Sequence, residues 1–178
     1  AISGWSDELG TAWQTPYPLA KDGAKPRGTG FIDLDGDGRP DFVYFHRYGA
    51  TENRGVSFSR VTGWAAEPAN SAWQLSFPLA VDERTDAGTR FIDYDGDGRV
   101  DFFHAYRNSD GTLGSNAYRN TEAGWVSMPA WALPVEIAAH GKGDLGRRFI
   151  DVNGDGKVDL VFSYASLGSI DAGAYLNS

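Results

Sequence analysis

The sequence contains no cysteine, a single methionine and no long apolar run. Without cysteine, the chain has neither a disulfide framework nor a thiolate metal site. No apolar stretch approaches the roughly 18 residues of a membrane-spanning helix, and no signal-peptide pattern opens the chain. The 16 Lys and Arg residues are not clustered, and 24 Asp and Glu residues bring the net charge to −8. We therefore expect no membrane insertion and no nucleic-acid partner, because phosphate binding requires clustered basic residues.

Catalytic motifs are also missing. Ser, His and Asp residues occur, but no GxSxG segment presents a nucleophile. The three histidines, His46, His104 and His140, lack the spacing of metal ligands. The glycine-rich segment 141–146 does not have the form of a phosphate-binding loop. We therefore expect that the protein is not an enzyme.

An acidic, glycine-punctuated nonapeptide occurs three times, at 33–41, 93–101 and 151–159. It holds eleven of the 24 acidic residues. Ca²⁺ takes about six to eight oxygen ligands, and this spacing offers side-chain oxygens at positions one, three, five and nine and a carbonyl at position seven. The sequence therefore predicts about three Ca²⁺ ions, one per loop. The predicted ligands are Asp33, Asp35, Asp37, the Arg39 carbonyl and Asp41; Asp93, Asp95, Asp97, the Arg99 carbonyl and Asp101; and Asp151, Asn153, Asp155, the Lys157 carbonyl and Asp159.

Two alternatives bear on these loops. An EF-hand needs a bidentate Glu at its twelfth position and flanking helices, but the twelfth residues are Tyr44, His104 and Phe162, and the flanking segments are rich in aromatic and β-branched residues. Such segments favour strands, so each loop is predicted to join two strands. A metal-free turn is the second alternative, because Asp, Asn and Gly dominate ordinary turns. Asn153 replaces an Asp, and we expect the third site to be the weakest.

The similarity between the three segments extends over a period of about 60 residues. Each loop is preceded by a Gly-Trp pair (Gly4-Trp5, Gly63-Trp64, Gly124-Trp125) and by a second tryptophan (Trp13, Trp73, Trp131). Because all six tryptophans recur at equivalent places, we interpret them mainly as packing residues. The alternative is a sugar-stacking platform, to which Trp5, Trp64 and Trp125 would contribute.

Four short strands are predicted in each period. In the first they are an edge strand at 13–19, a strand ending at the acidic loop, a strand at 41–46 and a last strand from Gly55. The segments 21–29 and 47–54 are interpreted as loops. The polar segments 48–54, 108–113 and 167–172 differ in sequence and are candidates for a binding surface.

Repeated four-stranded units are typical of β-propeller blades. We therefore expect an all-β fold, with a single domain over 1–178 made of repeats at approximately 4–62, 63–123 and 124–178. Propellers usually have about four to eight blades, so three blades do not close comfortably. A homodimer completing a six-bladed ring is one solution, and membership of a longer repeat protein is the other. The N-terminal strand is a candidate to complete the last blade, within the chain or in another copy.

The pattern Phe-Ile-Asp-x-Asp-Gly-Asp-Gly-x-x-Asp-Phe in the first two repeats, followed by a Gly-initiated strand, resembles the FG-GAP or VCBS repeat of integrin α-like propellers. The Phe-Gly and Gly-Ala-Pro tags of the first variant are not evident, so the VCBS type is the closer resemblance. The resemblance implies calcium at the loop positions named above and a secreted or cell-surface protein. It also implies a role in protein recognition or scaffolding, with a carbohydrate-binding lectin as the alternative.

Overall fold

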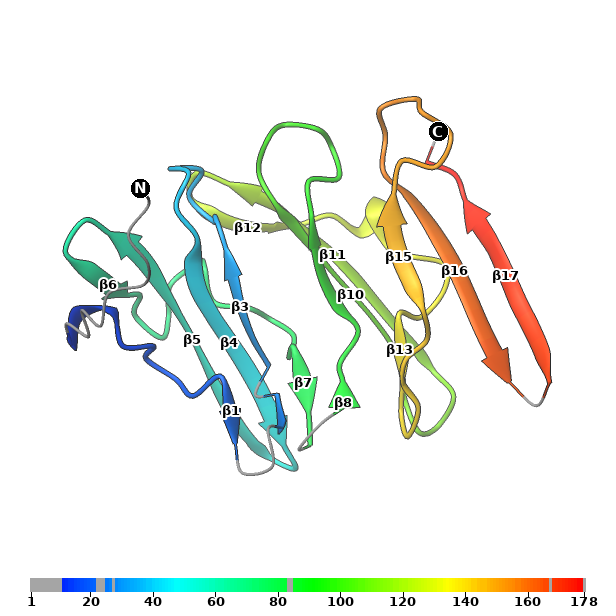
Figure 1. Cartoon of the computed structure of the whole chain (residues 1–178), viewed down its shortest axis with the longest axis horizontal. Helices are drawn as coiled ribbons and strands as arrows, with labels where there is room; N and C mark the ends of the chain where they lie inside the picture. The colour runs from blue at the N-terminus through cyan, green and yellow to red at the C-terminus, as the bar shows by residue number, and fades with distance from the viewer. Residues whose placement is uncertain (1–10, 22–24, 27, 83–84, 167, 178) are drawn as a thin grey trace, which may run out of the picture.

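The computed structural model describes residues 11–21, 25–26, 28–82, 85–166 and 168–177, and it places three antiparallel sheets side by side in a row (Figure 1). The first sheet consists of β3 (Thr29–Ile32), β4 (Asp41–Tyr48), β5 (Thr51–Arg60) and β6 (Gly63–Ala66). The second consists of β9 (Thr89–Ile92), β10 (Asp101–Arg107), β11 (Leu113–Thr121) and β12 (Gly124–Ser127). The third consists of β15 (Arg147–Ile150), β16 (Asp159–Ser166) and β17 (Ser169–Tyr175).

Short elements precede each sheet in the chain. They are η1 (Thr11–Trp13), β1 (Ala20–Lys21) and β2 (Lys25–Pro26); β7 (Ala80–Val81) and β8 (Thr85–Asp86); and η2 (Pro129–Trp131), β13 (Ala138–Ala139) and β14 (Gly143–Asp144). β7 pairs in parallel with β4, and β13 pairs in parallel with β10. Each of the first two sheets is therefore extended by the short hairpin of the next repeat, which ties neighbouring repeats together.

The core lies between the sheets because the strands after the acidic loops are apolar on both faces. Phe42 and Val43 of β4 and Phe102 and Phe103 of β10 are all fully buried. Such continuous apolar strands are expected where a sheet is covered on both sides. One cluster fills the space between the first and second sheets, and a second, built around Phe103 and Ile137, fills the space between the second and third. The prediction of an all-β fold with propeller-like blades is confirmed, and the sheets do not close into a barrel.

Two details of the predicted strand order are wrong. The segment 13–19 is not a strand: Trp13 and Trp131 end 3₁₀ turns, and Pro16 and Pro18 supply no N–H group to a ladder. The fourth strand of a sheet is instead the Gly-Trp segment, as in β6 and β12. Each of the first two sheets therefore includes the strand with which the next predicted repeat opens, and the repeat boundaries stay a prediction.

The predicted variable loops are also largely wrong. Most of 47–54 belongs to β4 and β5, which pair from Phe42 and Ser57 out to Tyr48 and Thr51. In the third repeat most of 165–172 belongs to β16 and β17. Segment 108–112 alone keeps a loop between its two strands. The predicted loop 21–29 holds β1 and β2 and the start of β3. Cross-strand pairing has extended these hairpins beyond what their polar sequences indicate, so the candidate binding loops are short.

No helix in the described ranges has the length and apolar character needed to cross a membrane.

Candidate metal-binding loops

Each acidic loop joins the first two strands of its sheet, β3 to β4, β9 to β10 and β15 to β16. All three loops lie along the same edge of the row (Figure 1). This confirms that the loops connect strands. No helix flanks them, because the neighbouring segments hold aromatic and β-branched residues that pack between sheets.

The first Asp of each loop organises its backbone. Asp33 accepts hydrogen bonds from the N–H groups of Gly36 at 2.8 Å, Asp37 at 3.1 Å and Gly38 at 2.9 Å. Gly36 and Gly38 have φ angles of +75° and +82°, which few side-chain-bearing residues adopt. Corresponding bonds reach Asp93 and Asp151 from the glycines of their loops.

The ninth Asp ties the loop to the third strand of its sheet. Asp41 is fully buried and accepts from the N–H groups of Leu34 at 2.9 Å and Ser59 at 2.8 Å. In the second loop Asp101 accepts from Tyr94 and Asn120. In the third, Asp159 accepts from Val152 and Asn177 in the same way. This structural role was not foreseen from the sequence, because the partners, in the third strand or two residues after it, lie 18 or 19 residues away.

Burial sets the acidity of the ninth carboxylate in the first two loops. Burial raises the pKa of Asp101 to about 6, and the charges of Asp95 and Asp97 add to the rise, although the N–H groups of Asn120 and Tyr94 oppose it. The pKa of Asp41 is raised for the same reasons, with Asp35 and Asp37 as the neighbouring charges. The loops therefore hold carboxylates that repel one another and that a cation would stabilise.

Carboxylates gather closely in two of the loops. Ligand oxygens of Asp33, Asp35 and Asp37 lie within 4.8 Å of one another, and so do those of Asp93, Asp95 and Asp101. Among the described residues the third loop forms no equivalent group of acidic side chains. There Asn153 Nδ2 donates to Asp155 at 3.1 Å. The donor sets of the first two loops fit a hard divalent cation, which prefers oxygen ligands.

The remaining predicted ligands lie in the same loops. The N–H groups of Arg39, Arg99 and Lys157 donate to Asp37, Asp97 and Asp155 at 2.9, 3.0 and 2.9 Å. These bonds place the seventh residue beside the fifth. Whether its carbonyl binds metal stays a prediction.

Two arginines that the sequence analysis did not single out pair with the loop carboxylates. Arg60 Nη1 lies 2.8 Å from Asp35 Oδ2 and 3.4 Å from Asp37 Oδ2. Arg119 lies 2.7 Å from Asp95 and 2.8 Å from Asp97. Both arginines come from the end of the third strand, so only the folded structure reveals their proximity to the loops. They neutralise part of the acidic charge in the first two loops.

The first two loops are also connected to each other. Asn120 is buried, and its Nδ2 donates to the carbonyl oxygens of Leu34 at 2.9 Å and Val100 at 3.1 Å. Arg99 Nη1 reaches the Asp35 carbonyl oxygen at 3.4 Å. The first loop is therefore hydrogen-bonded to the second loop and to β11 of the second sheet.

The tryptophans of the described Gly-Trp segments pack against other aromatic rings. Trp64 contacts Trp13, Phe31 and Phe42, and Trp125 contacts Trp73 and Phe102. Neither Trp64 nor Trp125 lines the cavities of about 230 and 400 Å³ that lie between repeats. Trp5 lies outside the described residues.

Comparison with known families agrees with this geometry. Residues 93–162 match the model of the FG-GAP-like repeat, a segment that begins at the first Asp of the second loop and includes the third loop. A search of curated proteins found no match. The match covers less than half of the chain and contains two of its three acidic loops. Residues 93–162 of this chain are therefore similar to the FG-GAP-like repeat.

Proposed function

We propose that the chain is a calcium-stabilised β-propeller-type module that recognises a protein outside the cell. The observation that carries this proposal is the convergence of three carboxylates within 4.8 Å in each of two equivalent strand-joining loops. Like charges at this distance are unfavourable, and Arg60 and Arg119 each neutralise them only in part. A bound Ca²⁺ would supply the missing positive charge and cross-link the loop.

Calcium binding would act mainly on stability. The loops order the junction of the first two strands, and the ninth Asp connects that junction to the third strand. An ion that binds only the folded chain raises the free energy of unfolding by about 2.7 kcal/mol per site at a hundredfold excess over Kd. Differential scanning calorimetry should therefore give a higher Tm in Ca²⁺ than in a chelator. Mg²⁺ should raise it less, because Mg²⁺ demands a stricter octahedral geometry.

A matched pair of variants separates a specific site from a general charge effect. Asp35→Asn and Glu52→Gln each remove one negative charge. Asp35 belongs to the first cluster, whereas Glu52 is exposed and pairs with Arg47 at 2.8 Å. The calcium-dependent rise in Tm should shrink in Asp35→Asn and persist in Glu52→Gln. Equal Tm values for the wild type in calcium and in chelator would refute the proposal.

The recognition role rests on the family resemblance and on the catalytic motifs that the sequence lacks. A secreted or cell-surface location follows from the same resemblance, and Kd values of extracellular calcium modules suit the calcium concentration outside cells. A lectin stays the alternative, and glycan-array binding in calcium, lost in chelator, would favour it. The ligand, and a homodimer that completes a six-bladed ring, stay predictions. A third ion in the weaker loop also stays a prediction, and so does the absence of an enzyme activity.

A further inference from the structure

The space between the first and second sheets contains a cavity of about 400 Å³. It lies between β3 and β9, beside the β7–β8 hairpin, which stands between the two sheets (Figure 1). A water molecule needs only about 10–15 Å³ of such volume, so the cavity has room for a side chain from outside. Its lining combines apolar side chains with one pair of opposite charges: Phe31, Ile32, Leu79 and Phe91, and Asp86 and Arg90.

A glycine of the first sheet leaves this space open. Gly30 lines the cavity and pairs with Val43 across the sheet. A Cβ atom at Gly30 would lie 3.4 Å from Val43 and 3.5 Å from Ile32, which both belong to the packing between the first and second sheets. A longer side chain at position 30 would therefore project into the cavity.

The second sheet shows which side chain occupies the equivalent place one repeat later. Arg90 and Gly30 each precede the first Asp of their acidic loop by three residues. Arg90 pairs with Phe103 as Gly30 pairs with Val43. Its Nη2 reaches Asp144 Oδ2, on the β13–β14 hairpin, at 3.4 Å. The second sheet therefore extends an arginine to the hairpin of the third repeat, and the first sheet has no such side chain at position 30.

Asp86 is the equivalent of Asp144 and has one cation fewer. Each Asp accepts a hydrogen bond from the backbone N–H two residues later. Each also pairs with the arginine four residues later, Asp86 with Arg90 at 2.7 Å and Asp144 with Arg148 at 2.8 Å. Asp144 has Arg90 as a second partner, whereas Asp86 pairs with a single arginine among the described residues. The Asp86 side chain is 27% exposed, so a cation from solvent can reach it.

We propose that this cavity binds an arginine side chain of a protein partner, and that the guanidinium group pairs with Asp86 as Arg90 pairs with Asp144. The inference rests on the recognition role proposed above and not on calcium binding. The bound arginine takes the place that Gly30 leaves open. It extends the alternating row of Asp86, Arg90, Asp144 and Arg148 by one further cation.

The chemistry of the cavity favours a guanidinium over other groups. A guanidinium is planar, is less strongly hydrated than an ammonium group and stacks on aromatic faces, and Phe31 and Phe91 line the cavity. Arginine already lies over phenyl rings elsewhere in this chain, for example Arg60 at 4.7 Å from the ring centroid of Phe58. An anion is disfavoured, because Arg90, the cation in the lining, is already paired with two carboxylates.

Two-dimensional ¹H–¹⁵N NMR spectra of the full chain, titrated with N-acetylarginine methylamide, test the site. The amide signals of residues 28–32 and 86–91 should shift and give a saturable binding curve. The matched control compound is N-acetylcitrulline methylamide, in which a neutral urea replaces the guanidinium. It should not bind, because it has the same shape without the charge that pairs with Asp86.

Two substitutions of one glycine test whether position 30 controls the cavity. Gly30→Arg reproduces the arrangement of the second sheet within the first, so its own guanidinium should pair with Asp86 and abolish binding of the arginine compound. Gly30 does not have a positive φ angle, and an added Cβ has room there. Gly30→Ala should therefore fold normally, leave the cavity open and keep the dissociation constant within about twofold.

A second pair of variants tests the carboxylate. Asp86→Asn should raise the dissociation constant of the arginine compound by about tenfold, as expected when a hydrogen bond between charged groups is lost. Asp110→Asn removes the same charge from the exposed turn between β10 and β11 and should change the dissociation constant by less than about twofold. The dispersion of the amide signals in each variant shows that the fold is kept.

The compounds and variants together decide the proposal. Binding that requires the guanidinium, is lost in Gly30→Arg and persists in Gly30→Ala supports it. Equal binding of the citrulline compound, undiminished binding to Gly30→Arg, shifts confined to other surfaces or no binding at all would overturn it. The titration is repeated in calcium and in chelator. Binding in both, with no effect of calcium on Tm, would support this inference and refute the calcium proposal, whereas a calcium-dependent Tm without arginine binding would overturn this inference alone.

Discussion

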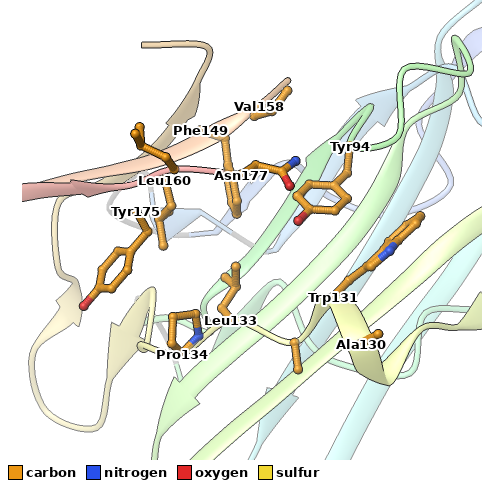
Figure 2. Close-up of a pocket in the computed structure, with 12 residues that line it drawn as sticks. Tyr94, Ala130, Trp131, Leu133, Pro134, Phe149, Val158, Leu160, Tyr175 and Asn177 are labelled. Atoms are coloured by element: carbon orange, nitrogen blue, oxygen red, sulfur yellow. The ribbon is translucent and has the colours of Figure 1, made fainter. Parts of the chain in front are cut away.

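The space between the first and second sheets, which we call the first junction, and the space between the second and third sheets, the second junction, are lined by equivalent residues but filled differently. In the first junction, Trp125 of the edge strand β12 packs against Trp73 and Phe102. In the second, Trp131 and Phe149 line a cavity of about 230 Å³ (Figure 2). The first junction is completed by β12, the fourth strand of the second sheet. The first two repeats are therefore not independent units, because the packing between them depends on that strand.

The largest expected effect is the removal of the side chain that completes the first junction. Trp125→Ala should lower the free energy of unfolding by about 3–5 kcal/mol, because it deletes a large packed ring and leaves a cavity. Trp131→Ala in the second junction should cost less, since Trp131 already borders open space. Urea denaturation of both variants measures the difference. Equal losses would mean that the two junctions are packed equally well.

The second prediction concerns how the free energy of unfolding depends on pH. It compares the second sheet, which holds His104, with the third sheet. Burial lowers the pKa of His104 to about 4 from 6.5, and the charge of Arg47 contributes. The unfolded chain then binds a proton between about pH 6.5 and pH 4 that the folded chain does not bind. The contribution of His104 to the free energy of unfolding therefore rises with pH through this window, and acidification from pH 7 to pH 4 should remove about 3 kcal/mol of it. The raised pKa of Asp101 acts in the opposite direction, so the effect of His104 is measured as a difference from a variant that lacks it.

The third sheet supplies the control for this prediction. Phe162 occupies the position in the third sheet that is equivalent to His104, and its side chain does not titrate. A phenyl ring should also preserve the stacking of His104 on Phe77, whose ring centroids lie 4.2 Å apart. His104→Phe should remove this part of the pH dependence. Denaturation midpoints of the wild type and the variant at pH 7 and pH 4 test it. Parallel losses in both proteins would assign the acid sensitivity to other groups.

The smallest of these effects concerns the glycine at the start of β12. Gly124→Ala should cost about 1–3 kcal/mol, because it adds a methyl group against Ala72 at a backbone angle that favours glycine. Gly111→Ala is the matched control. Gly111 also has a positive φ, but no atom lies within 4 Å of an added Cβ, so about 1 kcal/mol is expected. In thermal unfolding, Gly124→Ala should have a lower Tm than Gly111→Ala. The reverse order would contradict the close contact at Gly124.

The sequence was sufficient to predict the acidic loops and the strands beside them. Asp, Asn and Gly at fixed spacing determine the turn, and the aromatic residues after Asp41 or Asp101 determine a buried strand. The turns and the buried strands could be predicted because each depends on side chains only a few residues apart. An edge strand is predicted at 13–19 because prolines are tolerated at a sheet edge, but with Pro16 and Pro18 this segment forms no ladder at all.

Other features depend on contacts that a linear pattern does not contain. Arg60 and Arg119 reach the loop carboxylates from positions more than 20 residues away, and Asn120 reaches Leu34 across 86 residues. The sequence shows that the Gly-Trp segment recurs, but only the pairing of β6 with β5 and of β12 with β11 shows that it forms the fourth strand. Sequence periodicity shows which segments are equivalent, whereas strand pairing shows to which sheet each segment belongs.

The hydrogen bond from Asn177 to Asp159 connects the third acidic loop to the end of the third sheet. Asp159 is the ninth residue of that loop, and Asn177 lies two residues after β17. Order in the loop would therefore favour order at the end of β17, and the reverse would also hold. By thermodynamic reciprocity, each strengthens the other by the same factor. An ion bound in the third loop would then stabilise a backbone segment 18 residues away along the chain.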